Sequence, residues 1–114
     1  ENIARNIMNP ILKKVVTDGT GKNANLLEYD VAGKTGTSQK AQESGGRYSH
    51  DKYVGSFIAY APAENPRVCV LVMINEPKNG AYYGGTVSAP VVREIIRRSL
   101  LYLGIEPTKF QMTM

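Results

Sequence analysis

The stretch Lys34-Thr35-Gly36-Thr37 carries the most information in this chain, because it places a cation, two hydroxyl groups and a glycine within four residues. It lies inside Tyr29-Asp-Val-Ala-Gly-Lys-Thr-Gly-Thr-Ser-Gln-Lys40, which turn-rich segments flank, and this pattern predicts a strand over residues 29–39. Such a strand edge can hold an anionic substrate terminus and present a backbone N–H to a reacting carbonyl. The stretch therefore predicts one wall of an active site.

The bulk composition sets the class of protein. A chain of 114 residues with 42% hydrophobic and 21% charged residues is ordinary globular material that makes one small domain. The net charge of +4 permits an anionic partner. No stripe of aromatic and basic residues indicates nucleic-acid binding, so we expect no nucleic-acid partner.

The ends of the chain and its single cysteine suggest further expectations. Cys69 lies in the apolar run Arg67-Val-Cys-Val-Leu-Val-Met-Ile74, so it is expected to be a buried small hydrophobe rather than a catalytic thiol. No apolar run approaches the roughly 20 residues of a membrane span, and no stretch within these 114 residues is expected to be a signal peptide. Because the sequence opens on Glu1 inside a helical pattern, we expect residues 1–114 to be a fragment of a larger domain.

Hydrophobic periodicity predicts a helix at each end. At the start, apolar residues recur every four positions over residues 2–18, and Pro10 interrupts this pattern with a kink or restart. Asp18-Gly-Thr-Gly-Lys22 is expected to end the helix, with glycines able to adopt positive φ. A second helix is predicted over residues 89–103, with Ser88 as its N-cap and Gly104 after its end.

Two more strands are predicted over residues 53–61 and 67–75, after a polar loop from Ala41 to Lys52. The short turn Pro62–Pro66 joins them, so they should pair antiparallel. The last strand is apolar on both faces. Two helices are not expected to cover both faces of the sheet, so structure outside the chain is expected there. The predicted fold class is α+β, with three antiparallel strands between an N-terminal and a C-terminal helix.

Several motifs fail on inspection. Gly33-Lys34-Thr35 is no phosphate-binding loop, because Glu28 stands where that motif needs its first glycine. Ser49-His-Asp-Lys52 matches S-x-x-K, but it lies in a polar loop rather than on the helix that the catalytic version needs. His50 is expected to be solvated, and no cluster of residues has metal-ligand spacing, so we expect neither a metal nor a cofactor.

The wider context of K-T-G resembles a known family. Five segments occur in one order: Val15-Val-Thr-Asp-Gly-Thr-Gly-Lys22, Tyr29–Lys40, Phe57-Ile-Ala-Tyr-Ala-Pro62, Val72-Met-Ile-Asn-Glu-Pro77 and Tyr82-Tyr-Gly-Gly-Thr-Val-Ser-Ala-Pro90. From about residue 2 to residue 107 the chain resembles the C-terminal part of the transpeptidase domain of class B penicillin-binding proteins. The segment from Tyr82 to Pro90 and the following Ile105-Glu-Pro107 look most like the division-specific, septal branch.

The resemblance implies a fold and an activity. The fold would be a five-stranded antiparallel sheet flanked by helices, of which this chain supplies the last three strands. The activity would be that of a D,D-transpeptidase, in which a serine attacks the D-Ala-D-Ala bond of a peptidoglycan stem peptide and an amine resolves the acyl-enzyme into a crosslink. The S-x-x-K serine and the S-x-N motif are absent from this chain, so we expect the fragment alone to be inactive.

The resemblance also implies partners and a location. The expected partners are peptidoglycan stem peptides, β-lactams and the rest of the transpeptidase domain, with self-association of the fragment as a further possibility. The full-length protein is expected at the extracytoplasmic face of the bacterial cell membrane, held by an anchor that lies outside this chain.

Site roles follow for the matching residues. Lys34 would supply positive potential for the substrate carboxylate and for proton traffic, and the Thr37 N–H would be one oxyanion donor. The hydroxyls of Thr35 and Thr37 would bind the carboxylate, and Gly36 would let substrate backbone lie close to the strand. Tyr82 and Tyr83 would form an aromatic wall beside the acyl side chain, or else pack against the last helix.

Two other functions remain open at this point. One is another enzyme of the K-T-G group, such as a β-lactamase, a carboxypeptidase or a β-lactam sensor. The other is a small, non-enzymatic binding module that uses a basic strand edge.

Overall fold

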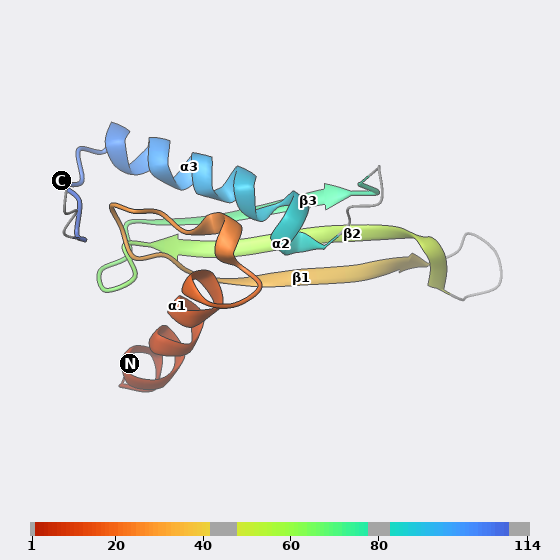
Figure 1. Ribbon diagram of the computed structural model, residues 1–114, viewed down its shortest axis with the longest axis horizontal. Helices are drawn as coiled ribbons and strands as arrows, with labels where there is room; N and C mark the ends of the chain where they lie inside the picture. Colours follow the sequence, from red (N-terminus) through yellow and green to blue (C-terminus); the bar gives the residue numbers. More distant parts are fainter. Residues whose placement is uncertain (1, 42–47, 78–82, 110–114) are drawn as a thin grey trace.

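Three antiparallel strands form the sheet at the centre of the chain, in the order β1-β2-β3 (Figure 1). They are β1 (Ala32–Ala41), β2 (Tyr48–Ala61) and β3 (Val68–Asn75). The computed structural model describes residues 2–41, 48–77 and 83–109, so Tyr82 and the middle of the loop predicted from Ala41 to Lys52 lie outside the described residues. The predicted α+β class is confirmed.

Helical segments lie before and after the sheet. The first is a π-helix, Ala4–Met8, which continues as α1 (Asn9–Thr17), and a 3₁₀-helix follows at Lys22–Ala24. After the sheet come α2 (Gly84–Val87) and α3 (Ala89–Tyr102), which runs along the sheet (Figure 1). Within the described residues, no helix has both the length and the apolar character needed to cross a membrane.

The core lies between α3 and one face of the sheet. Pairing puts Phe57 opposite Val72 and Ala59 opposite Val70, so these four side chains share the face toward the helix. Val92, Ile96 and Leu100 of α3 are fully buried against this layer. Val16, at the end of α1, also belongs to this core, which ties the first helix to the sheet.

The other face of the sheet is open along β3 in the described part of the chain, whereas Asn9 of α1 accepts a hydrogen bond from Tyr60 on the neighbouring strand β2. Ile58, Leu71 and Met73 are 44%, 56% and 63% exposed, because residues alternate between the two faces of a strand. Cys69 lies on this open face and is exposed, so the prediction that it is a buried small hydrophobe is wrong. Burial therefore alternates along β3, and the described elements cover one of its two apolar faces.

The N-terminal helix follows the prediction with two differences. The chain changes from π-helix to α-helix just before Pro10, which occupies the first turn of α1 as a proline restart requires. The glycines after the helix do not adopt positive φ; among the described glycines only Gly104 does, with φ 73°. Gly21 is small for another reason, because a Cβ there would lie 2.9 Å from the ring of Phe57.

The strand boundaries shift relative to the predictions. Residues 29–31 precede the first strand, and Tyr29 is instead buried in the core, where its hydroxyl donates to the carbonyl of Ile105. The second strand begins at Tyr48, so the loop predicted up to Lys52 is shorter. Pairing reaches Ala41 and Tyr48 after an irregularity beyond Gln39, which extends the hairpin through polar residues.

Ser88 begins α3 as predicted, but its side chain does not cap the helix. The short helix α2 leads directly into α3, so Ser88 already has helical dihedral angles. Its buried hydroxyl donates to the carbonyl of Gly55, at 2.8 Å, and this joins the start of α3 to β2.

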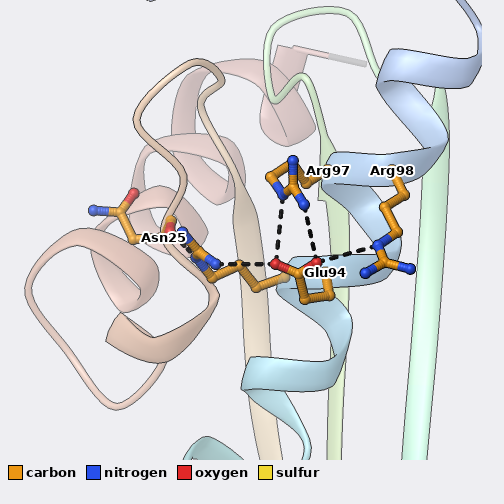
Figure 2. Close-up of polar contacts among 5 residues, drawn as sticks. Asn25, Glu94, Arg97 and Arg98 are labelled. Carbon is orange, nitrogen blue, oxygen red and sulfur yellow. Dashed lines mark hydrogen bonds and ion pairs between the residues drawn. The ribbon is translucent and has the colours of Figure 1, made fainter.

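Polar contacts join α3 to the segment that leads into β1 (Figure 2). Arg93 Nε donates to the carbonyl of Asn25 at 3.1 Å, and Arg93 Nη1 lies 3.3 Å from Glu94 Oε1. The same carboxylate pairs with Arg97 at 3.2 Å and with Arg98 at 3.3 Å. Hydrogen bonding from Arg97, with the charges of Arg97 and Arg98, holds the pKa of the Glu94 carboxyl below its ordinary value of 4.5.

We predict that Glu94→Gln makes the stability of the chain less dependent on acid. A lowered pKa in the folded state gives stability that is complete above the ordinary value of 4.5 and is lost as pH falls through the lowered value. Urea unfolding from about pH 7 down to about pH 3 should therefore show a steeper loss for the wild type than for Glu94→Gln. Glu106→Gln, which changes an exposed carboxylate with no ion pair among the described residues, is the control and should behave as the wild type does. Parallel acid profiles for Glu94→Gln and the wild type would contradict the expectation.

Candidate active site

The outer edge of β1 presents the K-T-G backbone. β1 pairs with β2 along one edge, and in the described strand order β1 is one of the two outer strands. The carbonyl of Gly36 faces β2, where it accepts from Ser56 Oγ at 3.3 Å. Because the N–H and C=O groups of successive residues point to alternate edges, those of Thr35 and Thr37 point outward. The Thr37 N–H is therefore directed away from the sheet, as an oxyanion donor needs.

The side chains of Thr35 and Thr37 line a pocket of about 520 Å³ beside this edge. They stand on the face that carries α2, opposite Phe57 and Gly55 respectively. The opposite wall comes from the turn after α1, and the floor from the residues around α2. Besides the two threonines, the lining consists of Gly19, Thr20, Lys22, Asn23, Tyr83, Gly84, Gly85 and Thr86.

A larger pocket, of about 670 Å³, lies elsewhere, between the N-terminal helix and the turn that joins β2 to β3. None of the residues of the K-T-G stretch lines it. Size alone does not mark the site here, because the groups that can bind a carboxylate and polarise a carbonyl gather around the smaller pocket.

Lys34 lies on the other face of β1 but reaches the same edge. Its partner across the ladder is Ile58, on the open face of the sheet. Its ammonium group nevertheless donates to the carbonyl of Thr35 at 3.0 Å and lies 3.4 Å from the Thr35 hydroxyl. The positive charge thus sits at the outer edge of β1, beside the hydroxyl that faces the pocket.

Gly36 has a packing reason of its own to be glycine. A Cβ at this position would lie 2.5 Å from Ser56 Oγ, on the face away from the pocket. Its suggested role in letting a substrate approach the strand stays a prediction.

Two glycines let helix α2 lie against this strand. The Gly84 N–H donates to Thr37 Oγ1 at 3.2 Å, and a Cβ on Gly84 would lie 1.9 Å from the carbonyl oxygen of Ser56. A Cβ on Gly85 would lie 2.2 Å from the carbonyl oxygen of Thr20. No larger residue fits without moving backbone, so the pair fixes the Thr37 hydroxyl against the start of α2.

The predicted aromatic residues are only partly placed. Tyr83 is 59% exposed and lines the pocket, next to Gly84. Tyr82 lies outside the described residues, so its suggested role as part of an aromatic wall stays a prediction.

The turn after α1 contributes residues that the sequence did not single out. Thr20 Oγ1 lies 3.4 Å from Thr35 Oγ1, and Asn23 Nδ2 donates to the carbonyl of Gly85 at 2.8 Å. In the sequence this turn was expected to end the helix and belongs to one of the five segments that carry the family resemblance, but it was given no role in the site. The Gly19-Thr20-Gly21 stretch was the available hint, but its place opposite Thr35 depends on tertiary packing.

The rejected motifs lie where no catalytic or phosphate-binding version could work. Residues 49–52 belong to β2 rather than to a helix. Gly33 to Thr35 belong to β1, and the strand continues where a phosphate-binding loop would begin a helix.

Comparison with known proteins now identifies the family. The model of the penicillin binding protein transpeptidase domain matches residues 2–97. The chain belongs to this family. Its match covers α1, the whole sheet and most of α3, so it includes every residue described above for the site.

Similar proteins carry names that agree with the family. Stage V sporulation protein D of Bacillus subtilis is 46% identical over 100 residues, which are 88% of this chain and 15% of that protein. A probable peptidoglycan D,D-transpeptidase, PenA, of Neisseria gonorrhoeae is 44% identical over 109 residues, 96% of this chain and 18% of that protein. The chain thus spans less than a fifth of the length of these two relatives.

Solved structures of the family share the fold. The transpeptidase domain of penicillin-binding protein 3 from Burkholderia pseudomallei superposes with a TM-score of 0.78 at 40% identity, covering 90% of this chain and 30% of that one. Penicillin-binding protein 3 of Mycobacterium tuberculosis in complex with ampicillin gives 0.76 at 30% identity, over 92% of this chain and 26% of that one.

We predict that Gly84→Ala disrupts the pocket and the fold around it. The added methyl group would meet backbone, which cannot rotate away, so the free energy of unfolding should fall by about 2–3 kcal/mol. Gly36→Ala is the matched comparison, because its methyl group would meet only the Ser56 hydroxyl, which can rotate, and the loss should be smaller. Urea unfolding measures both, and the amide chemical shift of Thr37 should move in Gly84→Ala. Equal stability of Gly84→Ala and the wild type would refute the close approach.

Proposed function

We propose that this chain forms the K-T-G wall of a peptidoglycan D,D-transpeptidase whose nucleophilic serine lies outside these 114 residues. The observation that carries the proposal is the outward edge of β1. There one backbone N–H, two threonine hydroxyls and one ammonium group converge beside a pocket. Family membership and the names of the relatives support it.

The proposed mechanism assigns each group a task. The serine attacks the carbonyl of the D-Ala-D-Ala bond, and the Thr37 N–H stabilises the oxyanion that forms. One such donor typically contributes about 3 kcal/mol to the transition state. The second donor would come from the nucleophile's own backbone.

The carboxylate of the leaving D-alanine would bind the hydroxyls of Thr35 and Thr37. Hydrogen bonds to a charged group contribute roughly 1.5–3 kcal/mol each. Lys34 adds positive potential at the same edge and would assist proton transfer near the S-x-N serine. The Gly84 N–H, which already donates to Thr37 Oγ1, leaves that hydroxyl's proton to point at the substrate.

β-Lactams would acylate the same serine and occupy the same edge. The structures of the Mycobacterium tuberculosis relative with ampicillin and aztreonam support this part of the proposal. Tyr83, exposed beside the pocket, would then flank the acyl side chain, together with Tyr82.

The proposed setting is septal cell-wall synthesis at the extracytoplasmic face of the membrane, with an anchor outside this chain. The rest of the transpeptidase domain would cover the open face of β3, where Leu71 and Met73 are exposed. In its absence this surface would favour self-association of the fragment. A β-lactamase, a carboxypeptidase, a β-lactam sensor and a small binding module are less well supported, since the named relatives include several peptidoglycan D,D-transpeptidases.

We predict that Thr35→Val slows acylation of the full-length protein by penicillin about ten- to a hundredfold, because it removes one charged hydrogen bond without changing the shape of the side chain. Stopped-flow or gel measurement with fluorescent penicillin gives the rate. Thr17→Val, at the exposed end of α1, is the control and should leave the rate unchanged. The isolated chain of 114 residues should form no adduct, and a serine-bound adduct on it would overturn the proposal.

A further inference from the structure

The pocket beside β1 extends past the K-T-G residues to the turn after α1, and this extension has no role in the acylation described above. Thr20 stands 3.4 Å from the Thr35 hydroxyl, and Lys22 and Asn23 continue the wall beyond it. The inference below rests on the proposed function, because its direction follows from where the substrate binds.

The oxyanion donor fixes which side of the bond each end of the pocket serves. The acyl carbonyl lies at the Thr37 N–H, and the carboxylate of the leaving residue lies toward Thr35. The turn adjoins Thr35, whereas Tyr83 adjoins Gly84 and hence Thr37. The end formed by the turn is therefore on the side of the leaving group.

The leaving residue and the acceptor must use the same side. In the second half-reaction the acceptor's neutral amine forms a bond to the acyl carbon and the ester bond to serine breaks. The serine oxygen takes up the proton that the amine loses. Since the attacking nitrogen takes the place of the departed one, the acceptor enters where D-alanine left.

The charges at this end favour an anion. Lys22 is exposed, and its ammonium group makes no ion pair or hydrogen bond with any described side chain. Threonine hydroxyls line the pocket at positions 20, 35, 37 and 86, and none of its described lining residues is acidic. The Lys22 ammonium group, which has no partner among the described side chains and lies beside hydroxyl donors, therefore favours a ligand with a negatively charged group.

We propose that the turn of Thr20, Lys22 and Asn23 is the acceptor subsite. Lys22 binds a second carboxylate of the acceptor, which is not the carboxylate next to the attacking amine. Asn23 acts as a positioning residue, because its hydrogen bond to the Gly85 carbonyl holds the turn against α2. A Cβ at position 85 would displace the carbonyl of Thr20. Glycine at this position therefore lets the turn lie close to α2, and this contact sets the width of the pocket beside Thr20.

The test compares two acceptors that differ only in charge. The full-length protein is acylated with a peptidyl thioester donor, and D-glutamate or D-glutamine then competes with water for the acyl-enzyme. The ratio of aminolysis to hydrolysis is measured for each by chromatography. Because both fates start from the same acyl-enzyme, this ratio does not depend on how fast that intermediate forms.

We expect the wild type to prefer D-glutamate. Lys22→Met should lower the preference about threefold and Lys22→Glu about tenfold, the range for an exposed ion pair and its reversal. Lys22→Arg should retain most of it. Lys14→Met, which removes an exposed lysine of α1 outside the pocket, should not change it.

Each other outcome counts against the inference. An unchanged preference in Lys22→Met and Lys22→Glu would show that Lys22 does not contact the acceptor. An equal fall in the ratio of aminolysis to hydrolysis with D-glutamate and with D-glutamine would show that the turn affects only the shape of the subsite and not its charge. If the wild type forms no acyl-enzyme at all, the proposed function fails and this inference fails with it.

Discussion

The arrangement of the site depends on one close approach between backbones. Gly84 and Gly85 have no Cβ, so the start of α2 can lie directly against β1, β2 and the turn after α1 at once. The Gly84 N–H holds the Thr37 hydroxyl, while the Gly85 carbonyl holds Asn23. Three segments far apart in the sequence thereby form one pocket. The side chains of Thr35 and Thr37 are held in place by hydrogen bonds to Thr20 and Gly84.

The sheet around this contact leaves two different surfaces. One face packs against α3, where Ile96 and Leu100 are fully buried, and this gives β1 a rigid support. The outer edge of β1 is the surface to which the proposed function assigns the substrate. Edge strands are usually protected from pairing with another chain, and here Lys34 places a charge at that edge, which discourages such pairing.

The sequence predicted the local elements well where the signal was local. The apolar run of β3, the proline in the first turn of α1 and the glycine after α3 all point to structure within a few residues, and the structure contains a strand, a helix start and a helix end at these places. The strand carrying K-T-G was expected to be extended, and it is. The expectation that Cys69 is buried failed, because an apolar strand shows which side chains could be covered but not which face is covered.

The parts of the site that the sequence missed depend on contacts between distant residues. Asn23 and Gly85 are 62 positions apart, and nothing in the turn's own composition indicates where it will pack. Ser88 shows the same limit, since its side chain bonds Gly55 of β2 instead of capping its own helix. Residue types could therefore suggest Lys34, Thr35 and Thr37, while the opposite wall of the pocket required the fold.

The most direct test is a crystal structure of the penicillin acyl-enzyme of the full-length protein. The account predicts that the acyl carbonyl oxygen accepts a hydrogen bond from the Thr37 N–H, and that the penicillin carboxylate contacts the hydroxyls of Thr35 and Thr37. A structure in which another strand pairs with the outer edge of β1, or in which the carboxylate binds away from both threonines, would contradict it.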